Sequence, residues 1–198
     1  MRGKSTRLAK QMMGLVAFVM VSWRLIIYLV TRQFIEKDIA FAAASESIGR
    51  IPGLRGVYFR QAFYRRTLAF CGEDIYFGWH SVFSKAGARL GNGVYIGRRC
   101  TLGLVEVGAE TMLSDGVQVL SGGRQHGFEL GGSVSYKEQP QSFSRVRIGP
   151  NAWLGTNAVI MADVGESSII GAGAVVTEAI PDRVLAAGVP AKVKRRLD

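Results

Sequence analysis

An aliphatic residue, usually followed by glycine, recurs every six residues from about residue 88 to residue 190. Each six-residue unit supplies a short strand and a turn, and three units close one triangular coil with the aliphatic side chains inside. We expect the neighbouring glycine to supply turn backbone that bulkier residues resist. A single coil cannot bury its inner face, so the coils are stable only as a stack. The repeat predicts a mainly β fold, a parallel β-helix over residues 73–180, and leaves a Gly-rich β-sandwich as the weaker alternative. The in-phase positions include Leu90, Ile96, Leu102, Val107, Leu113, Val119, Ile148, Leu154, Ile160, Val164, Ile170 and Val176.

The repeat is lost once, in a loop over residues 120–146. An excursion of this length from a regular stack is usually functional when it is ordered. It holds His126, one of the two histidines in the chain, together with Glu129 and Arg124. Histidine suits general-base chemistry near pH 7 because its pKa lies close to that pH. A solvated loop histidine is the alternative, and His80, which precedes the regular repeat, is interpreted as structural.

Basic charge is concentrated near the N-terminus. Residues 1–70 hold 12 Lys and Arg against 3 Asp and Glu, a net charge of +9, whereas residues 71–198 hold 13 against 12, a net charge of +1. A nucleic-acid-binding protein normally carries its charge on the folded recognition unit, so we expect no nucleic-acid partner. Here the charge surrounds a hydrophobic stretch, Met12–Val30, whose one charged residue is Arg24. This arrangement favours an anionic membrane surface as the partner.

Residues 1–72 are therefore expected to form a helical, membrane-associated region. Aromatic residues and arginines alternate from Tyr58 to Arg66, which suits the lipid headgroup zone; the alternative is that the rings pack under the first coil as a cap. Basic residues flank the hydrophobic stretch almost equally on both sides. A helix that lies in the interface or re-enters is thus favoured over one that crosses, and a signal peptide is less favoured still.

The distal part of the chain resembles the left-handed β-helix family of hexapeptide acyltransferases. The resemblance rests on Trp153–Ile160, Ile170–Thr177, the Ile180–Pro181 pair and Ala187–Arg195. This ordered set is similar to the galactoside and maltose acetyltransferases and to polysaccharide O-acetyltransferases, and it covers roughly residues 75 to 196. The resemblance implies a left-handed coil, a homotrimer and acetyl-CoA as co-substrate.

The resemblance also assigns candidate residues. His126 stands where the family has a loop histidine that acts as general base, and Glu129 or a backbone carbonyl would orient it. The sequence departs from the family at two positions. Gly116 stands where relatives often have an asparagine, so the group that would stabilise the oxyanion is not identified. Glu178 stands where relatives often have a lysine, which removes a cation from the nucleotide end. Residues 181–198 are expected to be a basic tail that meets either phosphates or water. The implied cofactor-binding residues are Trp153 at the thioester, unless it packs in an interface, Thr156 and Ala172 along the pantetheine arm, and Thr177, Lys192 and Arg195 near the nucleotide.

We therefore expect an acetyl-CoA-dependent O-acetyltransferase that acts on a sugar hydroxyl of a polysaccharide or lipid-linked glycan by direct transfer. Acetyl-CoA is cytosolic, which places the protein on the cytoplasmic side of the inner membrane. The alternatives are an N-acyltransferase on an amino-sugar nucleotide and a non-catalytic β-helix scaffold. Two histidines exclude a three-histidine zinc site, and no metal is expected. Cys71 and Cys100 are interpreted as reduced thiols.

Overall fold

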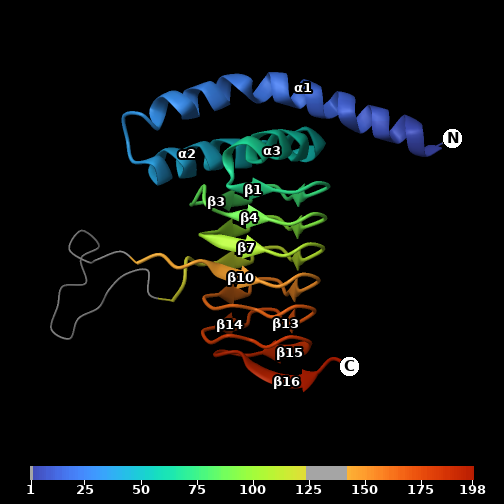
Figure 1. Cartoon of the computed structure of the whole chain (residues 1–198), viewed down its shortest axis with the longest axis vertical. Coiled ribbons are helices and arrows are strands. Elements are labelled where there is room, and N and C mark those ends of the chain that lie inside the picture. Colours follow the sequence, from blue (N-terminus) through green and yellow to red (C-terminus); the bar gives the residue numbers. More distant parts are fainter. Residues whose placement is uncertain (1, 124–141) are drawn as a thin grey trace.

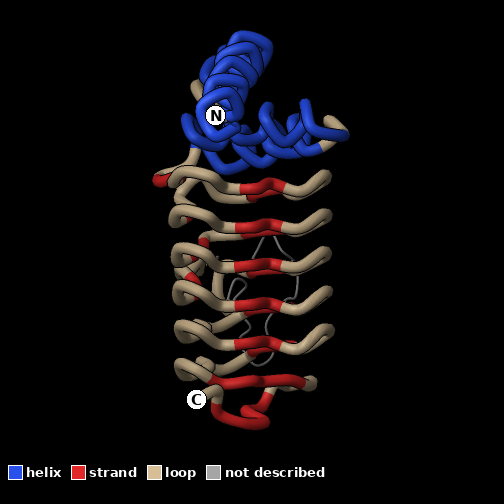
Figure 2. Tube along the Cα trace, turned by 90° about the vertical axis from the view of Figure 1, so that its right-hand side faces the viewer, coloured by secondary structure: helices blue, strands red, loops and turns tan. Residues whose placement is uncertain are grey.

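Three helices lie across one end of a stack of short strands (Figure 1). The computed structural model describes residues 2–123 and 142–198. The helices are α1 (Arg2–Thr31), α2 (Lys37–Gly49) and α3 (Gly53–Thr67). They form a helical cap, and the chain then winds away from it in about five coils that Figure 2 shows edge-on. The expected mainly β fold with an N-terminal helical region is confirmed.

Each coil contributes one strand to each of three sheets, in which parallel pairing continues down to β15. The first sheet has the order β1-β4-β7-β10, the second β2-β5-β8-β11-β13-β15-β16 and the third β3-β6-β9-β12-β14. Isolated parallel bridges, Ile148 with Val164 and Val164 with Ile180, continue the first sheet. The strands are β1 (Phe70–Cys71), β2 (Tyr76–Phe77), β3 (Val82–Phe83), β4 (Arg89–Leu90), β5 (Tyr95–Ile96), β6 (Thr101–Leu102), β7 (Val105–Val107), β8 (Met112–Leu113), β9 (Gln118–Val119), β10 (Val146–Ile148), β11 (Trp153–Leu154), β12 (Val159–Ile160), β13 (Ile169–Ile170), β14 (Val175–Val176), β15 (Val184–Ala187) and β16 (Lys192–Arg196).

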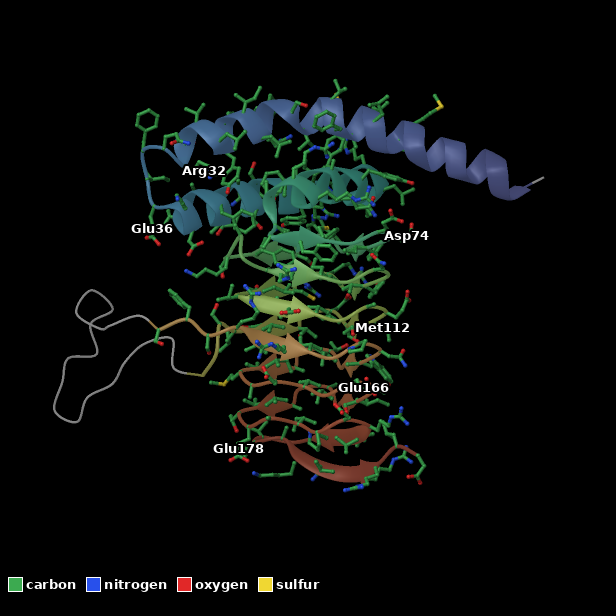
Figure 3. The ribbon with its side chains drawn as sticks, in the orientation of Figure 1. Arg32, Glu36, Asp74, Met112, Glu166 and Glu178 are labelled. Carbon is green, nitrogen blue, oxygen red and sulfur yellow. The ribbon has the colours of Figure 1, made fainter. Side chains whose placement is uncertain are left out.

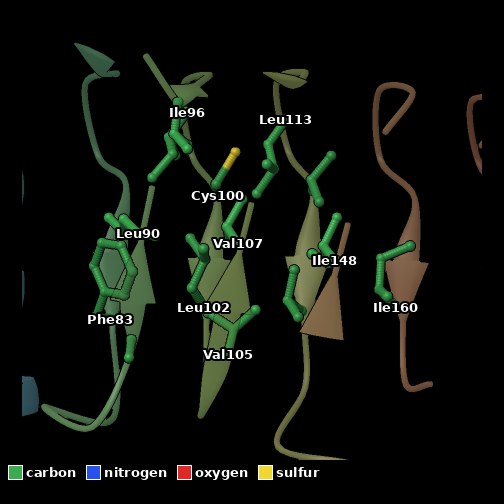
Figure 4. Close-up of a cluster of buried hydrophobic side chains, with 14 of the residues drawn as sticks. Phe83, Leu90, Ile96, Cys100, Leu102, Val105, Val107, Leu113, Ile148 and Ile160 are labelled. Atoms are coloured by element: carbon green, nitrogen blue, oxygen red, sulfur yellow. The ribbon is translucent and has the colours of Figure 1, made fainter. Parts of the chain in front are cut away.

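The core is a column of aliphatic side chains inside the coils (Figure 4). In most strands the first residue faces outward and the second is buried, as in Tyr95 and Ile96. In-register pairing places each inner residue on its counterpart in the next coil, for example Leu102 on Val119. Burying one such side chain contributes about 2 kcal/mol, so the column supplies most of the stabilisation of the stack.

The glycine after the aliphatic residue is required for close approach between coils, which corrects the turn-backbone interpretation. A Cβ on Gly155 would lie 2.5 Å from the amide nitrogen of Ala172 in the next coil. The left-handed backbone conformation falls two residues later, at Asn157 with φ 58°. Non-glycine residues occupy that position in several coils, Arg99 among them. The glycine position therefore leaves room for the backbone of the next coil, whereas the position two residues later accepts a strained, positive φ.

The stack begins earlier than the repeat indicates. The first coil starts at β1, and its inner positions include Phe77 and Phe83 instead of aliphatic residues. Both rings lie under Tyr64 of α3, with ring centroids 4.9 and 4.8 Å from it. The larger side chains close the end of the core where no further coil can stack, and for that reason the six-residue pattern is faint there.

The C-terminal segment is part of the stack and not an appended tail. β15 pairs in parallel with β13, and β16 turns back to pair antiparallel with β15. A reversed strand ends the coil succession because it offers no parallel edge for another turn. The basic side chains of β16 are nevertheless exposed.

A buried arginine fastens the helical cap to the first coil. Arg60 of α3 is fully buried and donates to the carbonyl oxygens of Gly49, the last residue of α2, and Ile51, at 3.3 and 2.8 Å. Its Nε donates to the Phe77 carbonyl at 3.2 Å. Burial lowers the pKa of the guanidinium, and these three carbonyls compensate for the lost water.

The long helix α1 has two different sides. One packs on α3 and α2 through Val21, Leu25 and Tyr28, which are buried. The other exposes large apolar side chains, and the exposed face continues through Phe34 after the helix. The stretch Met12–Thr31 is long and apolar enough to cross a membrane, with mean hydropathy 2.1, and 22% of it is buried inside the protein.

Candidate active site

The outer face of the third sheet lies between two corners of the coil that carry the sequence-predicted site residues. The outward residues of this sheet, from the cap downward, are Val82, Thr101, Gln118, Val159 and Val175. The corner before the sheet carries Thr156 and Ala172. The corner after it carries the loop stem and Thr177. We call this face with its two corners the groove face.

The loop leaves and returns through a stem at residues 120–123 and 142–145 that is hydrogen-bonded to the stack. The Ser144 amide donates to the Ser121 carbonyl at 3.0 Å, and the buried Ser121 hydroxyl accepts from the Leu104 amide at 2.8 Å. Arg145 donates to the Gly87 carbonyl at 3.1 Å and lies 3.7 Å from the Glu106 carboxylate. The stem leaves the stack at the end of the third coil, and these contacts fix it to the corners where the second and third coils begin.

A cation joins this stem to the helical cap. Lys85 follows β3, and its Nζ lies 2.7 Å from the Asp38 carboxylate of α2. The same Nζ lies 3.7 Å from the centre of the Phe143 ring in the returning stem. The sequence analysis missed these residues, because 47 positions separate Asp38 from Lys85 and neither belongs to the repeat.

The structure brings Thr156 and Ala172 together on adjacent coils. The Gly173 amide donates to the Thr156 carbonyl at 2.8 Å, and both Thr156 and Ala172 are exposed. No atom lies within 4 Å of the position where a Cβ on Gly173 would stand, so open space adjoins the backbone here. Trp153 precedes this corner on the outward side of β11, and its Nε1 donates to the Ser114 hydroxyl at 3.0 Å.

Thr177 and Lys192 lie around Glu178 at the far corner. Thr177 follows β14 one coil below Met161, since the Met161 amide donates to the Val176 carbonyl. The Lys192 Nζ lies 3.4 Å from the Glu178 carboxylate, and both side chains are largely exposed. Figure 3 shows Glu178 on the same side of the stack as the loop stem. Arg195 is separate from this group, in β16 opposite Leu185 of the second sheet.

Gly116 and Asp115 have structural roles in the turn above Thr156. The Asp115 carboxylate accepts from the Arg98 amide at 2.7 Å and pairs with the Arg98 side chain at 3.1 Å. Gly116 has φ 74°, and a Cβ added there would fall on the Asn157 side-chain oxygen. The Asn157 amide group therefore fills the space that an asparagine at position 116 would need.

The predicted base His126 and its partner Glu129, with Arg124, lie outside the described residues. His80 has φ 63°, and its backbone amide donates to the Gly49 carbonyl at 3.0 Å beneath the cap. Cys71 and Cys100 are free thiols, and burial raises the pKa of each to about 11. The described residues contain no cluster of side chains suited to a metal ion.

Comparison with known proteins gives one family match and several relatives. Residues 145–178 match the family described as bacterial transferase hexapeptide (six repeats). A segment of 55 residues is 47% identical to galactoside O-acetyltransferase of Escherichia coli (strain K12) and covers 27% of each chain. A segment of 64 residues is 42% identical to galactoside O-acetyltransferase of Lactococcus lactis (strain IL1403) and covers 31% of each. The aligned part thus spans about a quarter to a third of these curated relatives.

Solved structures match over more of the fold. A maltose O-acetyltransferase from Clostridium difficile 630 has a TM-score of 0.68 at 20% identity, over 83% of this chain and 90% of that one. A galactoside acetyltransferase in complex with coenzyme A has a TM-score of 0.67 at 24% identity, over 83% and 84%. The three stacked sheets and these structural neighbours show a β-helix fold, and residues 145–178 within it carry the hexapeptide repeat described for bacterial transferases.

Proposed function

We propose that the protein is an acetyl-CoA-dependent O-acetyltransferase that acts on a sugar hydroxyl of a polysaccharide or a lipid-linked glycan. The observation that carries this proposal is the groove face, where the stem of the His126 loop stands across the third sheet from Thr156 and Ala172. The segment shared with galactoside O-acetyltransferases supports a sugar acceptor.

The residues at this face fit coenzyme A. A pantetheine arm needs room beside exposed backbone, and the open space at Gly173, next to the small side chain of Ala172, supplies it. The nucleotide phosphates need cations, and β16 exposes Lys192, which pairs with Glu178 at the far corner, and Arg195, which lies opposite Leu185 of the second sheet. Exposed ion pairs contribute little, about 0–1 kcal/mol, so Lys192 can leave Glu178 for a phosphate.

His126 has the chemistry of the general base in the proposed reaction. Bound acetyl-CoA supplies an activated acetyl group as a thioester. His126 takes the proton of the acceptor hydroxyl while the hydroxyl oxygen bonds to the acetyl carbon. It then returns this proton to the sulfur after the carbon–sulfur bond has broken, so that the products are an acetyl ester and a free thiol. Glu129 is the proposed partner that orients the imidazole.

We further propose that the protein is a homotrimer assembled through its second sheet. The outward side of this sheet is an apolar ladder that includes Tyr76, Tyr95, Met112 and Trp153, each exposed. The Tyr76 and Tyr95 rings stack at 4.8 Å, and Figure 3 shows Met112 at the edge of the stack away from the loop stem. Exposed apolar ladders are typical of protein interfaces. Met112→Lys should yield monomers in analytical ultracentrifugation, whereas Arg147→Gln on the first sheet should leave the trimer intact.

The helical cap supports a position on the cytoplasmic face of the inner membrane. Because one side of α1 is packed on α2 and α3, its apolar side is free to lie along a bilayer without crossing it. The proposal predicts that a cysteine introduced beyond residue 85 in intact cells does not react with a membrane-impermeant reagent added outside. Labelling from outside would contradict it.

The test of the activity uses purified full-length protein with acetyl-CoA and candidate sugars, both free and lipid-linked. Thiol release and a mass gain of one acetyl group on the acceptor measure transfer. His126→Ala should abolish both signals while the trimer remains. The matched control is His80→Asn, which replaces the other histidine with a residue that accepts a positive φ. Full turnover in His126→Ala would refute the assigned base, and transfer to an amino group alone would favour the N-acyltransferase.

A further inference from the structure

A cavity of about 490 Å³ opens between α1, the C-terminal half of α2 and the start of α3. Its walls include three arginines, Arg24, Arg50 and Arg55, and one carboxylate, Glu46. Each arginine comes from a different part of the helical cap: the middle of α1, the end of α2 and the first turn of α3. The fold therefore gathers three positive charges that the sequence spreads over 32 positions.

These cations lack anionic partners within the described part of the chain. None of the three guanidinium groups forms an ion pair there, and the buried Nε of Arg24 has no hydrogen-bond acceptor. A buried donor without an acceptor costs about 1–3 kcal/mol. Glu46 balances one of the three charges, so the cavity keeps a net positive charge that an anion would neutralise.

The start of α3 borders the same cavity through Pro52 and Arg55. Pro52 is the N-cap of this fifteen-residue helix and supplies no side-chain acceptor for the first amide groups. Such amides carry partial positive charge and favour anions, phosphate above all. The adjacent Arg55 side chain is exposed, so backbone and guanidinium donors are available to one ligand.

The cavity lies at the border of the apolar face of the cap. Trp23 is 53% exposed on α1 and holds the Arg24 guanidinium 4.4 Å from its ring centre. On the α3 side Leu54, beside Arg55, is 75% exposed. Apolar side chains next to arginines and a tryptophan are characteristic of the level at which lipid headgroups lie.

We propose that this cavity binds the phosphate group of a membrane lipid, whose hydrocarbon chains lie along the exposed side of α1. Guanidinium groups bind phosphate oxygens in pairs, which distinguishes phosphate from a simple negative charge. Glu46 and Arg50 also line a second cavity with Val82 and Thr101, so the site borders the upper end of the groove face. Its proposed phosphate binding does not require acetyl transfer. It would fix how the cap is rotated on the bilayer, and hence which side of the stack faces a membrane-bound acceptor.

The test is co-sedimentation of the full-length protein with three kinds of vesicle. One contains phosphatidylcholine alone, one adds phosphatidate, and one adds oleate to the same surface charge. We expect phosphatidate vesicles to bind more tightly than oleate vesicles. Arg55→Gln should weaken phosphatidate binding about tenfold, the value of one charge-assisted hydrogen bond, and should leave oleate binding nearly unchanged.

Matched variants separate the site from general charge and from folding. Arg65→Gln removes the same charge from the other end of α3 and should have little effect. Glu46→Gln removes the opposing charge and should tighten phosphatidate binding, an effect of opposite sign that damage to the fold cannot produce. Equal binding of oleate and phosphatidate, or equal loss in Arg65→Gln and Arg55→Gln, would overturn the phosphate assignment.

Inorganic pyrophosphate as a soluble competitor tests the source of the phosphate. A membrane lipid also buries apolar surface on α1, so pyrophosphate should displace phosphatidate vesicles only weakly. Tight binding of pyrophosphate together with no vesicle binding would reject the lipid in favour of a soluble phosphate ligand. These measurements do not involve acetyl-CoA, so loss of acetyl transfer in the His126 experiment and loss of phosphate binding here are distinguishable results.

Discussion

Lys85 and Asp38 form an ion pair of 2.7 Å that joins the helical cap to the coil beside the loop stem. The Lys85 side chain is only 14% exposed, and its Nζ also contacts the Phe143 ring. Asp38→Asn should leave this half-buried cation without its partner and lower the free energy of unfolding by about 1–2 kcal/mol. Urea denaturation measures the change, and Lys37→Met, one position from Asp38, is the control. If the pair also positions the stem, acetyl transfer should fall further than stability alone explains.

Gly155 and Asn157 belong to one turn, but substitution should cost much more stability at Gly155 than at Asn157. Gly155→Ala places a methyl group against the backbone of the next coil, where neither chain can yield, and should cost about 3 kcal/mol. Asn157→Gly relieves a positive φ and should change stability by less than about 1 kcal/mol. Thermal denaturation of the two variants is the measurement. Similar losses in both would refute the distinction between close approach and turn strain.

Glu178 is expected to oppose cofactor binding. Its carboxylate pairs with Lys192 at 3.4 Å, close to where the proposed nucleotide phosphates lie. Glu178→Gln should free this cation and lower the KM for acetyl-CoA about threefold, with kcat unchanged. Glu166→Gln is the control, because Glu166 likewise pairs with an exposed cation, Arg183, but lies across the stack (Figure 3). A rise in KM would place the phosphates elsewhere.

The two thiols should be slow to react in the folded protein. Burial raises the pKa of Cys100 from 9.0 to about 11, and Cys71 behaves alike. At pH 8 each should react with iodoacetamide about a hundredfold more slowly than in urea, since only the thiolate is nucleophilic.

Because folding raises the pKa of both thiols, the free energy of unfolding should fall as the pH rises. The contribution of the buried, protonated thiols is fully present below pH 9 and is lost as pH rises through 9 to 11. Cys100→Ala should therefore reduce the fall in unfolding free energy across that window. An unchanged pH profile would contradict the assignment.

The stack of coils was predictable because the residues that define each coil lie close together in the sequence. Leu154 and Ile170 follow from a six-residue spacing that any coil must satisfy to fill its interior. The predicted β-helix begins at residue 73, but the six-residue pattern is clear only from about residue 88, because the end of the core requires rings such as Phe77, which interrupt the aliphatic pattern. The hand of the coil stays a prediction.

The candidate site was predictable in part. The structure places Thr156 beside Ala172, and the binding role that the resemblance implies for them stays a prediction. The link between Lys85 and Asp38 and the buried Arg60 depend on contacts between distant segments, which no periodic pattern encodes. His126 remains a prediction from the chain alone.

Because the coils repeat at a fixed spacing, their number sets the distance between the helical cap and the loop stem. Three coils separate the helical cap from the level at which the loop departs, and each adds about 4.8 Å, the distance between paired strands. The loop stem would thus stand about 15 Å from the cap. With α1 on a bilayer, the layer of α2 and α3 between α1 and the stack would add about 10 Å to the distance from the membrane. Inserting or deleting one whole coil above the stem would raise or lower that height in a single step and leave the coils that carry Thr156, Ala172 and Thr177 unchanged. Such variants would measure how far from its lipid anchor an acceptor sugar must reach.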